Sequence, residues 1–336
     1  MNRRDAEDAE RREGGVANSN RIATDTLLTE ALAFYNADCL LEAAQKYQEI
    51  IQIDNNCADA WHGLGMVYFI QENYQESLEV LSQGLTLDYS NSNLLYSLGL
   101  VLEKIGYLDE AIVAYQQVIQ LSPQWIEGYH SLGKVFTETG DFAQAKTIYL
   151  QAIELDKNSH LSYLYLGNLL MIQQQSDRAI NAYQKALQIK PFDSTILNNL
   201  GIAFAANNES AQASLYFGYA AYYQAEYTPA IKHFQNFLST QTGEIDTYLH
   251  LSLALQECGQ TEEAIQAIDD ALNLFPNNLT LKLEKARILP ILYKNQQELK
   301  FYRQRFTQGL LELIQSTELV SNESKKKCFA SYQLAN

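Results

Sequence analysis

Cysteine, proline and tryptophan are scarce in this sequence of 336 residues, which contains four cysteines, five prolines and two tryptophans. The cysteines form no CxxC pair and no regular framework, so we expect reduced thiols rather than a disulfide scaffold or a zinc site. They are Cys39, Cys57, Cys258 and Cys328. No stretch of about 18 apolar residues is present, which argues against a membrane span. The N-terminal residues MNRRDAEDAERREGG lack the apolar segment of a secretory signal, so we expect a cytoplasmic protein without a membrane partner.

Basic side chains are scarce over most of the chain. Residues 24 to 278 contain nine basic and 30 acidic side chains, whereas residues 279 to 336 contain ten basic and five acidic ones. The long middle section therefore carries a strong negative charge. This distribution argues against nucleic acid as a partner, because binding to a phosphate backbone requires clustered lysine and arginine.

Catalytic and cofactor motifs are also missing. The five histidines belong to no HExxH motif, and neither a GxSxG motif nor a glycine-rich phosphate loop is present. Carboxylates are plentiful, but nothing in the pattern distinguishes a pair for acid–base chemistry. We therefore expect no catalytic residue, no cofactor and no metal site in this chain.

One repeating pattern dominates the sequence. The segment WHGLG at residues 61–65 has counterparts at 95–99, 129–133, 163–167 and 197–201, each ending in Leu-Gly. A small residue follows twelve positions after each of these glycines, and a large one four positions later. The small residues are Ser77, Ala111, Ala145, Ala179 and Ala213, and the large ones are Leu81, Tyr115, Tyr149, Tyr183 and Phe217.

This combination of Leu-Gly, small, aromatic and repeat-ending proline positions resembles the tetratricopeptide repeat, whose unit is about 34 residues long. Apolar residues at i, i+3, i+4 and i+7 indicate two amphipathic helices in each unit. We expect the recurring glycine of the first helix to lie against the second helix, so that a larger side chain at Gly133 or Ala145 costs about 1–3 kcal/mol. The sequence therefore predicts an all-α solenoid of helix pairs.

The repeat register changes once. Units begin at residues 24, 58, 92, 126, 160 and 194, and the next unit begins at 211, only half a repeat later. Half a repeat corresponds to one helix, so the helix at about 210 to 225 fits two roles, as the second helix of one unit and the first helix of the next. We predict a half-unit break near residues 207–228. The expected domains are a disordered leader (1–23), an N-terminal sub-array (24–210), a C-terminal sub-array (211–278) and a degenerate last unit with a linker helix (279–336).

The segment at this break, YFGYAAYYQAEY (216–227), is rich in aromatic rings. Two interpretations are open. The rings fill the extra volume of an irregular junction, or they form a surface for a partner.

The resemblance implies which side chains face the concave groove, namely positions 2, 5, 9 and 12 of each first helix. The candidate groove residues are Asp25, Asp59, His62, Tyr96, Glu127, His130, Lys134, Asn168, Asn198 and Asp246, together with Tyr35 and Phe69. An acidic groove with aromatic and imidazole groups suits an extended, basic protein segment. The same side chains are equally compatible with an ordinary solvated face.

Two known recognition modes of tetratricopeptide grooves fit poorly. Only Lys134 and Asn168 resemble the clamp that reads C-terminal carboxylates. O-GlcNAc transferases carry a ladder of asparagines at position 6, and only Asn199 matches it here.

The segment from Ala286 to Phe306 resembles the connecting segment of bacterial proteins of the SPINDLY and O-GlcNAc transferase family. The matching residues are Arg287, Pro290, Tyr293, Arg303, Arg305 and Phe306. Pro290 is expected to end a first helix near Leu289, and a second helix is expected from about Asn295 to Ser316. In that family the segment leads to a glycosyltransferase domain, which the resemblance implies is lacking here.

Three hypotheses follow. The first is a non-catalytic module that binds basic protein segments, corresponding to the substrate-recruiting arm of a SPINDLY-like glycosyltransferase. The second is a subunit of a split glycosyltransferase that acts with a separate catalytic chain. The third is a free-standing scaffold or assembly factor unrelated to glycosylation.

Overall fold

The computed structural model describes residues 21–289 and 295–316, which form α-helices and short connections and contain no strand. The chain divides into two compact units, Met1–Leu169 and Leu170–Asn336, and each is described by itself. The boundary falls within α9, His160–Ile172. The predicted division into sub-arrays at residue 210 lies inside the second unit and stays a prediction. Among the described helices, none combines the length and the apolar character needed to cross a membrane.

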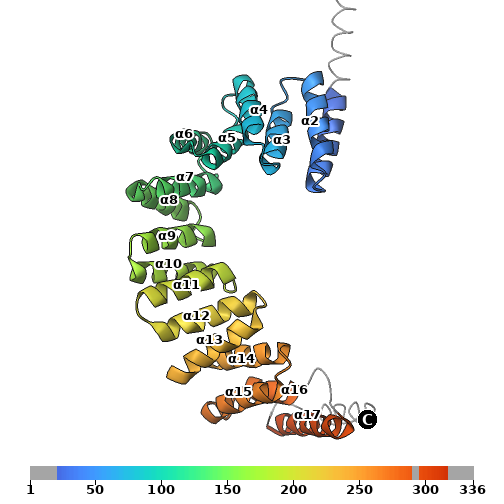
Figure 1. Ribbon diagram of the computed structural model, residues 1–336, viewed down its shortest axis with the longest axis vertical. Helices are drawn as coiled ribbons and strands as arrows, with labels where there is room; N and C mark the ends of the chain where they lie inside the picture. The colour runs from blue at the N-terminus through green and yellow to red at the C-terminus, as the bar shows by residue number, and fades with distance from the viewer. Residues whose placement is uncertain (1–20, 290–294, 317–336) are drawn as a thin grey trace, which may run out of the picture. The chain divides into compact units, whose positions relative to one another are not determined.

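The first unit is built from antiparallel helix pairs (Figure 1). Its first described helix covers residues 21–36, so residues 21–23, which we had assigned to the leader, are helical. The helices that follow before α9 are α2 (Leu40–Ile53), α3 (Ala58–Ile70), α4 (Tyr74–Leu87), α5 (Ser92–Ile105), α6 (Leu108–Leu121), α7 (Ile126–Glu138) and α8 (Phe142–Leu155).

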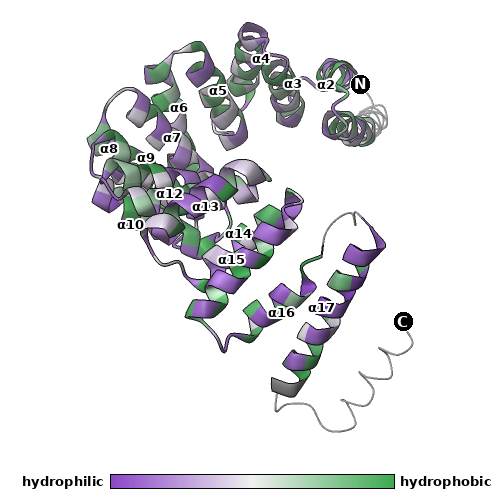
Figure 2. Ribbon diagram, turned by 60° about the horizontal axis from the view of Figure 1, so that its bottom comes forward, coloured by the Kyte–Doolittle hydropathy of each residue, from purple (hydrophilic) through white to green (hydrophobic). Residues whose placement is uncertain are grey.

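The second unit continues the pattern and ends in two unequal helices. Its helices are α10 (Ser176–Ile189), α11 (Ser194–Ala206), α12 (Ser210–Tyr223), α13 (Tyr227–Thr240), α14 (Ile245–Glu257), α15 (Thr261–Leu274), α16 (Leu279–Arg287) and α17 (Gln296–Ser316). Hydrophobic and hydrophilic residues alternate along these helices as expected for amphipathic elements (Figure 2).

A left-handed residue follows the first helix of each unit before the last one and allows the chain to turn back. Positive φ angles recur at the fifteenth position of the units that begin at residues 24 to 245. They occur at Asp38, Glu72, Gly106, Gly140, Gln174, Asn208, Ala225 and Gly259. Such a residue satisfies the last carbonyl groups of a helix while reversing the chain, and it is usually glycine because L-residues are strained there.

Close contact between the two helices of a unit explains the recurring Leu-Gly. A Cβ atom placed on Gly133 would lie 2.4 Å from a ring carbon of Tyr149. Gly99 meets Tyr115 in the same way, at 2.5 Å. The expected close approach of the paired helices is therefore confirmed, and Ala145 beside it is completely buried.

The half-unit break predicted near residues 207–228 is confirmed by two independent features that recur after half a repeat. Gly201 of α11 lies against Phe217 of α12, and Gly218 of α12 lies against Phe234 of α13. The positive φ angles at Asn208 and Ala225 are separated by the same half repeat. Helix α12 is thus the second helix of one pair and the first helix of the next.

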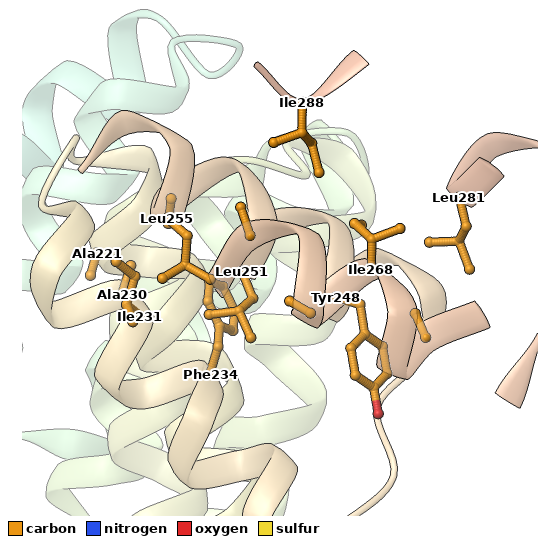
Figure 3. Packing of buried hydrophobic residues seen from close by; sticks show 14 residues of the cluster. Ala221, Ala230, Ile231, Phe234, Tyr248, Leu251, Leu255, Ile268, Leu281 and Ile288 are labelled. Carbon is orange, nitrogen blue, oxygen red and sulfur yellow. The ribbon is translucent and has the colours of Figure 1, made fainter. Parts of the chain in front are cut away.

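The core of the second unit extends from α12 to the residues after α16. Phe234, Leu251, Ile268 and Leu281 belong to one buried cluster to which five helices contribute (Figure 3). The cluster closes on Ile288, which is fully buried directly after α16. This part of the repeat pattern therefore remains a packed core although the last unit is degenerate.

The end of the described chain agrees with the expected helices. Helix α16 ends at Arg287, close to the predicted position, and α17 begins at Gln296. Pro290 and Tyr293 lie outside the described residues. Tyr302 of α17 is buried, and Gly309 lies close to Ala286 of α16, so α17 packs on the last helix of the array.

Candidate functional site

First helices of three successive units enclose a cavity of about 290 Å³ in the first unit. Tyr35 from the helix at residues 21–36, His62 from α3 and Tyr96 from α5 line it. Trp125, directly before α7, closes one side, with its ring centroid 4.8 Å from that of Tyr96. We call this cavity the first-unit groove. It brings together three of the residues predicted to face a groove.

Side chains at position 5 of one first helix bond to the next first helix. His62 Nε2 lies 2.8 Å from Ser97 Oγ, and the Tyr96 hydroxyl lies 3.2 Å from Ser131 Oγ. His130 Nε2 lies 2.8 Å from Ser162 Oγ. The three serines are buried, so these bonds fix the spacing of neighbouring first helices. Ser97 and Ser131 occupy the positions where the asparagine ladder would stand, and they are already bonded within the protein.

The two histidines in this row are neutral at physiological pH. Burial lowers the pKa of both His62 and His130 below the ordinary value of 6.5, although Asp59 and Glu127 act in the opposite direction. Burial dominates because it disfavours the charged imidazolium. The imidazoles therefore join helices and contribute no positive charge to the groove.

Lys134 is held by a carboxylate that the sequence analysis missed. Glu103 accepts hydrogen bonds from Lys134 Nζ at 2.9 Å and from the Tyr115 hydroxyl at 3.1 Å. Burial lowers the pKa of Lys134, but the bond to Glu103 outweighs it and raises the pKa overall. Glu103 occupies position 12 of its unit, so the rule that selected the other residues would have found it. Since Lys134 is paired, the site differs from a clamp for free carboxylates.

The predicted acidic residues lie at the exposed beginnings of first helices. Asp59 and Glu127 are exposed in the first turns of α3 and α7, and Asp246 is exposed in the first turn of α14. Asp25 is exposed on the helix at residues 21–36. A carboxylate in the first turn also stabilises its own helix through the helix dipole. These side chains thus combine a local structural role with a negative field at the helix ends.

The remaining predicted residues do not line this cavity. Asn168 and Asn198 are half-buried on α9 and α11, and Phe69 stacks edge-on against Tyr74 at 5.7 Å. Of the linker residues, Arg287 and Arg303 are exposed and Phe306 is half-buried. Arg305 donates from Nη2 to the carbonyl oxygen of Ile288.

A larger cavity of about 420 Å³ lies in the second unit. Three tyrosines of α12 form one wall, and α14 contributes Asp246 and His250. The tyrosines are Tyr216, Tyr219 and Tyr223. The opposite wall comes from the end of α10 and from Phe192 in the connection to α11. We call this cavity the break pocket, because its tyrosine wall is the helix that belongs to two units.

The described residues offer no site for a metal ion, since they contain no group of three or more histidine, cysteine, aspartate or glutamate side chains that could hold one. Cys39, Cys57 and Cys258 are free thiols. Cys328 lies outside the described residues.

Comparison with family models identifies the repeat. A model described as "TPR repeat" and two described as "Tetratricopeptide repeat" match the chain. The first matches residues 104–140 and 167–208, and the others match 58–91, 126–159, 148–181 and 245–278. Together these matches cover just over half of the chain.

A peroxisomal targeting signal receptor from Candida albicans is 27% identical over 186 residues, which are 53% of this chain and 31% of the receptor. The chain thus spans about a third of the length of this relative. Among solved structures, PilF of Pseudomonas aeruginosa has a TM-score of 0.54 and 20% identity, covering 66% of this chain and all of that one. A tetratricopeptide-repeat protein from Cytophaga hutchinsonii has a TM-score of 0.53 and 15% identity, covering 71% of this chain and 98% of that one. At these identities the two structures support the fold alone.

Proposed function

Because the chain belongs to the family of tetratricopeptide-repeat proteins, we propose that it is an interaction module that holds an extended, basic segment of a partner protein in its first-unit groove. The observation that carries this proposal is the cavity shared by three successive first helices, lined by Tyr35, His62 and Tyr96. A groove across several parallel first helices offers a series of contacts to an extended chain.

The charge of the first unit supports a basic ligand. Residues 24–169 contain nineteen acidic and five basic side chains. Asp59 and Glu127 are exposed at the beginnings of first helices, and burial keeps His62 and His130 neutral. A negative field attracts lysine and arginine side chains and raises the rate of association, and salt screens this effect.

Charge reversal tests the proposal. We expect Asp59→Lys combined with Glu127→Lys to weaken binding of fluorescent twelve-residue basic peptides by about tenfold or more in anisotropy titrations at low salt. The matched control is Glu79→Lys combined with Glu154→Lys, because these exposed residues lie on the second helices α4 and α8 and give the same change in net charge. Equal losses in both pairs, or binding that is indifferent to salt, would show that Asp59 and Glu127 only interact with solvent.

A second candidate is the tetratricopeptide arm of a SPINDLY-like glycosyltransferase, or a subunit that works with a separate catalytic chain. It rests on the resemblance between Ala286 and Phe306. In the described part of that segment, Arg305 bonds to Ile288 and its guanidinium lies 5.2 Å from the centre of the Tyr302 ring.

The test is sugar-nucleotide turnover in a complex captured through this chain. Turnover by the purified chain alone would contradict its role as a non-catalytic module, and absence of turnover in the complex favours a scaffold unrelated to glycosylation. For either candidate function we propose that the protein acts in the cytoplasm, which agrees with the free thiols of Cys39, Cys57 and Cys258.

A further inference from the structure

The break pocket exists because α12 belongs to two helix pairs. One face of α12 packs Phe217 against α11, and Gly218 accommodates Phe234 of α13. The face that remains carries Tyr216, Tyr219 and Tyr223, which are spaced at i, i+3 and i+7. Without the half-unit break, α12 would be a second helix only. Because the break also makes it a first helix, α12 lies beside α14, the next first helix, and its tyrosines meet Asp246 and His250.

The rings of the pocket are held in place by hydrogen bonds. His250 Nδ1 lies 2.7 Å from the carbonyl oxygen of Asp246, and an oxygen of this kind only accepts, so Nδ1 carries the proton. His250 Nε2 and the Tyr223 hydroxyl lie 3.0 Å apart and share a second hydrogen bond. The Tyr219 ring lies perpendicular to the imidazole, with centroids 5.0 Å apart. The aromatic wall is thus fixed before any ligand arrives.

The charge of the pocket is negative. The exposed carboxylate of Asp246 lines it, whereas neither lysine nor arginine is among the lining residues. Glu244 also lies near the pocket, because its charge acts on Tyr219. Burial raises the pKa of Tyr219 to about 12, and the negative charges of Asp246 and Glu244 raise it further. A purely apolar ligand would displace water from Asp246 without replacing its hydrogen bonds.

We propose that the break pocket is a binding site for an arginine side chain of a partner protein. Aromatic faces attract a cation through their quadrupole, and a planar guanidinium also stacks on them. Asp246 offers a carboxylate for a charge-assisted hydrogen bond to the same group. Phe192, 66% exposed at the pocket and 5.0 Å from the Tyr223 ring, is positioned to cover the stem of the side chain. Lysine fits less well because a compact ammonium ion cannot stack.

The proposal deepens the proposed function, since it rests on a basic protein segment as the ligand, but it concerns another unit and other residues. A short peptide can therefore test it without the first-unit groove. The probe is a nine-residue glycine and serine peptide with one central arginine. Matched peptides carry lysine or citrulline, the uncharged analogue of arginine. Binding is followed by NMR of the protein with isotopically labelled tyrosine.

We expect the arginine peptide to shift tyrosine signals of the native protein, and we expect these shifts to be lost in Tyr219→Ala. The citrulline peptide should bind about tenfold more weakly than the arginine peptide, and the lysine peptide several-fold more weakly. Asp246→Asn, which keeps the shape of the side chain, should weaken arginine binding about tenfold. Far-UV circular dichroism and the melting temperature verify that each variant is folded. Equal binding of arginine and citrulline, or of arginine and lysine, would overturn the proposal, as would an unaltered affinity in Asp246→Asn.

The same titration separates the two proposals. The pair Asp59→Lys and Glu127→Lys should leave the single-arginine peptide unaffected, because both residues lie in the first unit. If this pair abolishes binding of long basic peptides while citrulline and arginine bind equally, only the break-pocket proposal fails. If the pair has no effect on the binding of long peptides while Asp246→Asn weakens binding of the single-arginine peptide, only the proposal for the first-unit groove fails.

Discussion

At the scale of single residues, two kinds of position determine how the helices meet. Left-handed residues reverse the chain after the first helices that precede α16, and they include alanine, asparagine and glutamate as well as glycine. Imidazole and hydroxyl groups at position 5 join α3 to α5, α5 to α7 and α7 to α9. Both kinds of position give predictions that single substitutions can test.

Ala225 has a φ of 60° and should be strained. We expect Ala225→Gly to raise the free energy of unfolding by up to about 1 kcal/mol. Glycine removes the strain of the left-handed conformation, which costs an L-residue about 1–2 kcal/mol, but it also increases the backbone entropy of the unfolded chain, which offsets part of this stabilisation. The matched change is Gly259→Ala, at a φ of 72° where no atom lies within 4 Å of the new Cβ. It should lower stability by a similar amount. Urea unfolding of both variants measures the effect, and a stabilising Gly259→Ala would contradict the account.

The buried imidazoles predict a pH dependence. A pKa lowered in the folded state means that the unfolded chain binds more protons, so the stabilisation is complete above a pH of about 6.5 and decreases as the pH falls below it. We expect the melting temperature of the protein to fall between pH 7 and 5. His62→Gln combined with His130→Gln should show a smaller fall, since glutamine does not titrate. If the variant and the native protein lose stability equally over this interval, the histidines are not the cause.

At the scale of helices, the account depends on the two roles of α12. The Gly218 contact with Phe234 exists only if α12 acts as a first helix toward α13. We expect Gly218→Leu to destabilise the protein by about 1–3 kcal/mol through overpacking, as Gly201→Leu should on α11. Gln235→Leu, at an exposed position of α13, is the control and should be nearly neutral. A neutral Gly218→Leu in chemical unfolding would mean that the break lies elsewhere.

Most of the arrangement of the helices could be predicted from the sequence. The helix pairs follow from the regular repeat, and the single half-repeat spacing located the break, since both depend only on intervals along the chain. The break pocket could not be predicted in this way. Phe192, Tyr223 and Asp246 come from three places in the sequence, and only the packing of α10, α12 and α14 brings them together.

The groove was predicted only in part for a similar reason. Periodicity assigns a side chain to one face of a helix, and three of the residues selected in this way, Tyr35, His62 and Tyr96, line one cavity. It does not reveal which of these groups already bond within the protein. His130 is bonded to Ser162 and Lys134 to Glu103, so they are less available to a ligand than their positions suggested.

At the scale of the whole molecule, the two proposed binding sites differ in character. The first-unit groove lies across first helices and matches an extended segment, whereas the break pocket matches one side chain. Asp246 lines the break pocket, and the charges of Asp59 and Glu127 act on His62 and Tyr96 of the first-unit groove, in a chain with a formal charge of -16. Two sites for one basic partner would strengthen binding by increasing the effective concentration at the second site, provided that the ligand is long enough to reach both.

The central claim is that first helices of the first unit hold the ligand, and photo-cross-linking tests it most directly. A basic twelve-residue peptide with one benzoylphenylalanine is bound and irradiated, and mass spectrometry then identifies the attached residues. The account predicts attachment to the helix at residues 21–36, α3, α5 and α7, near Tyr35, His62 and Tyr96. Attachment in the first unit confined to the second helices α2, α4, α6 and α8 would contradict it.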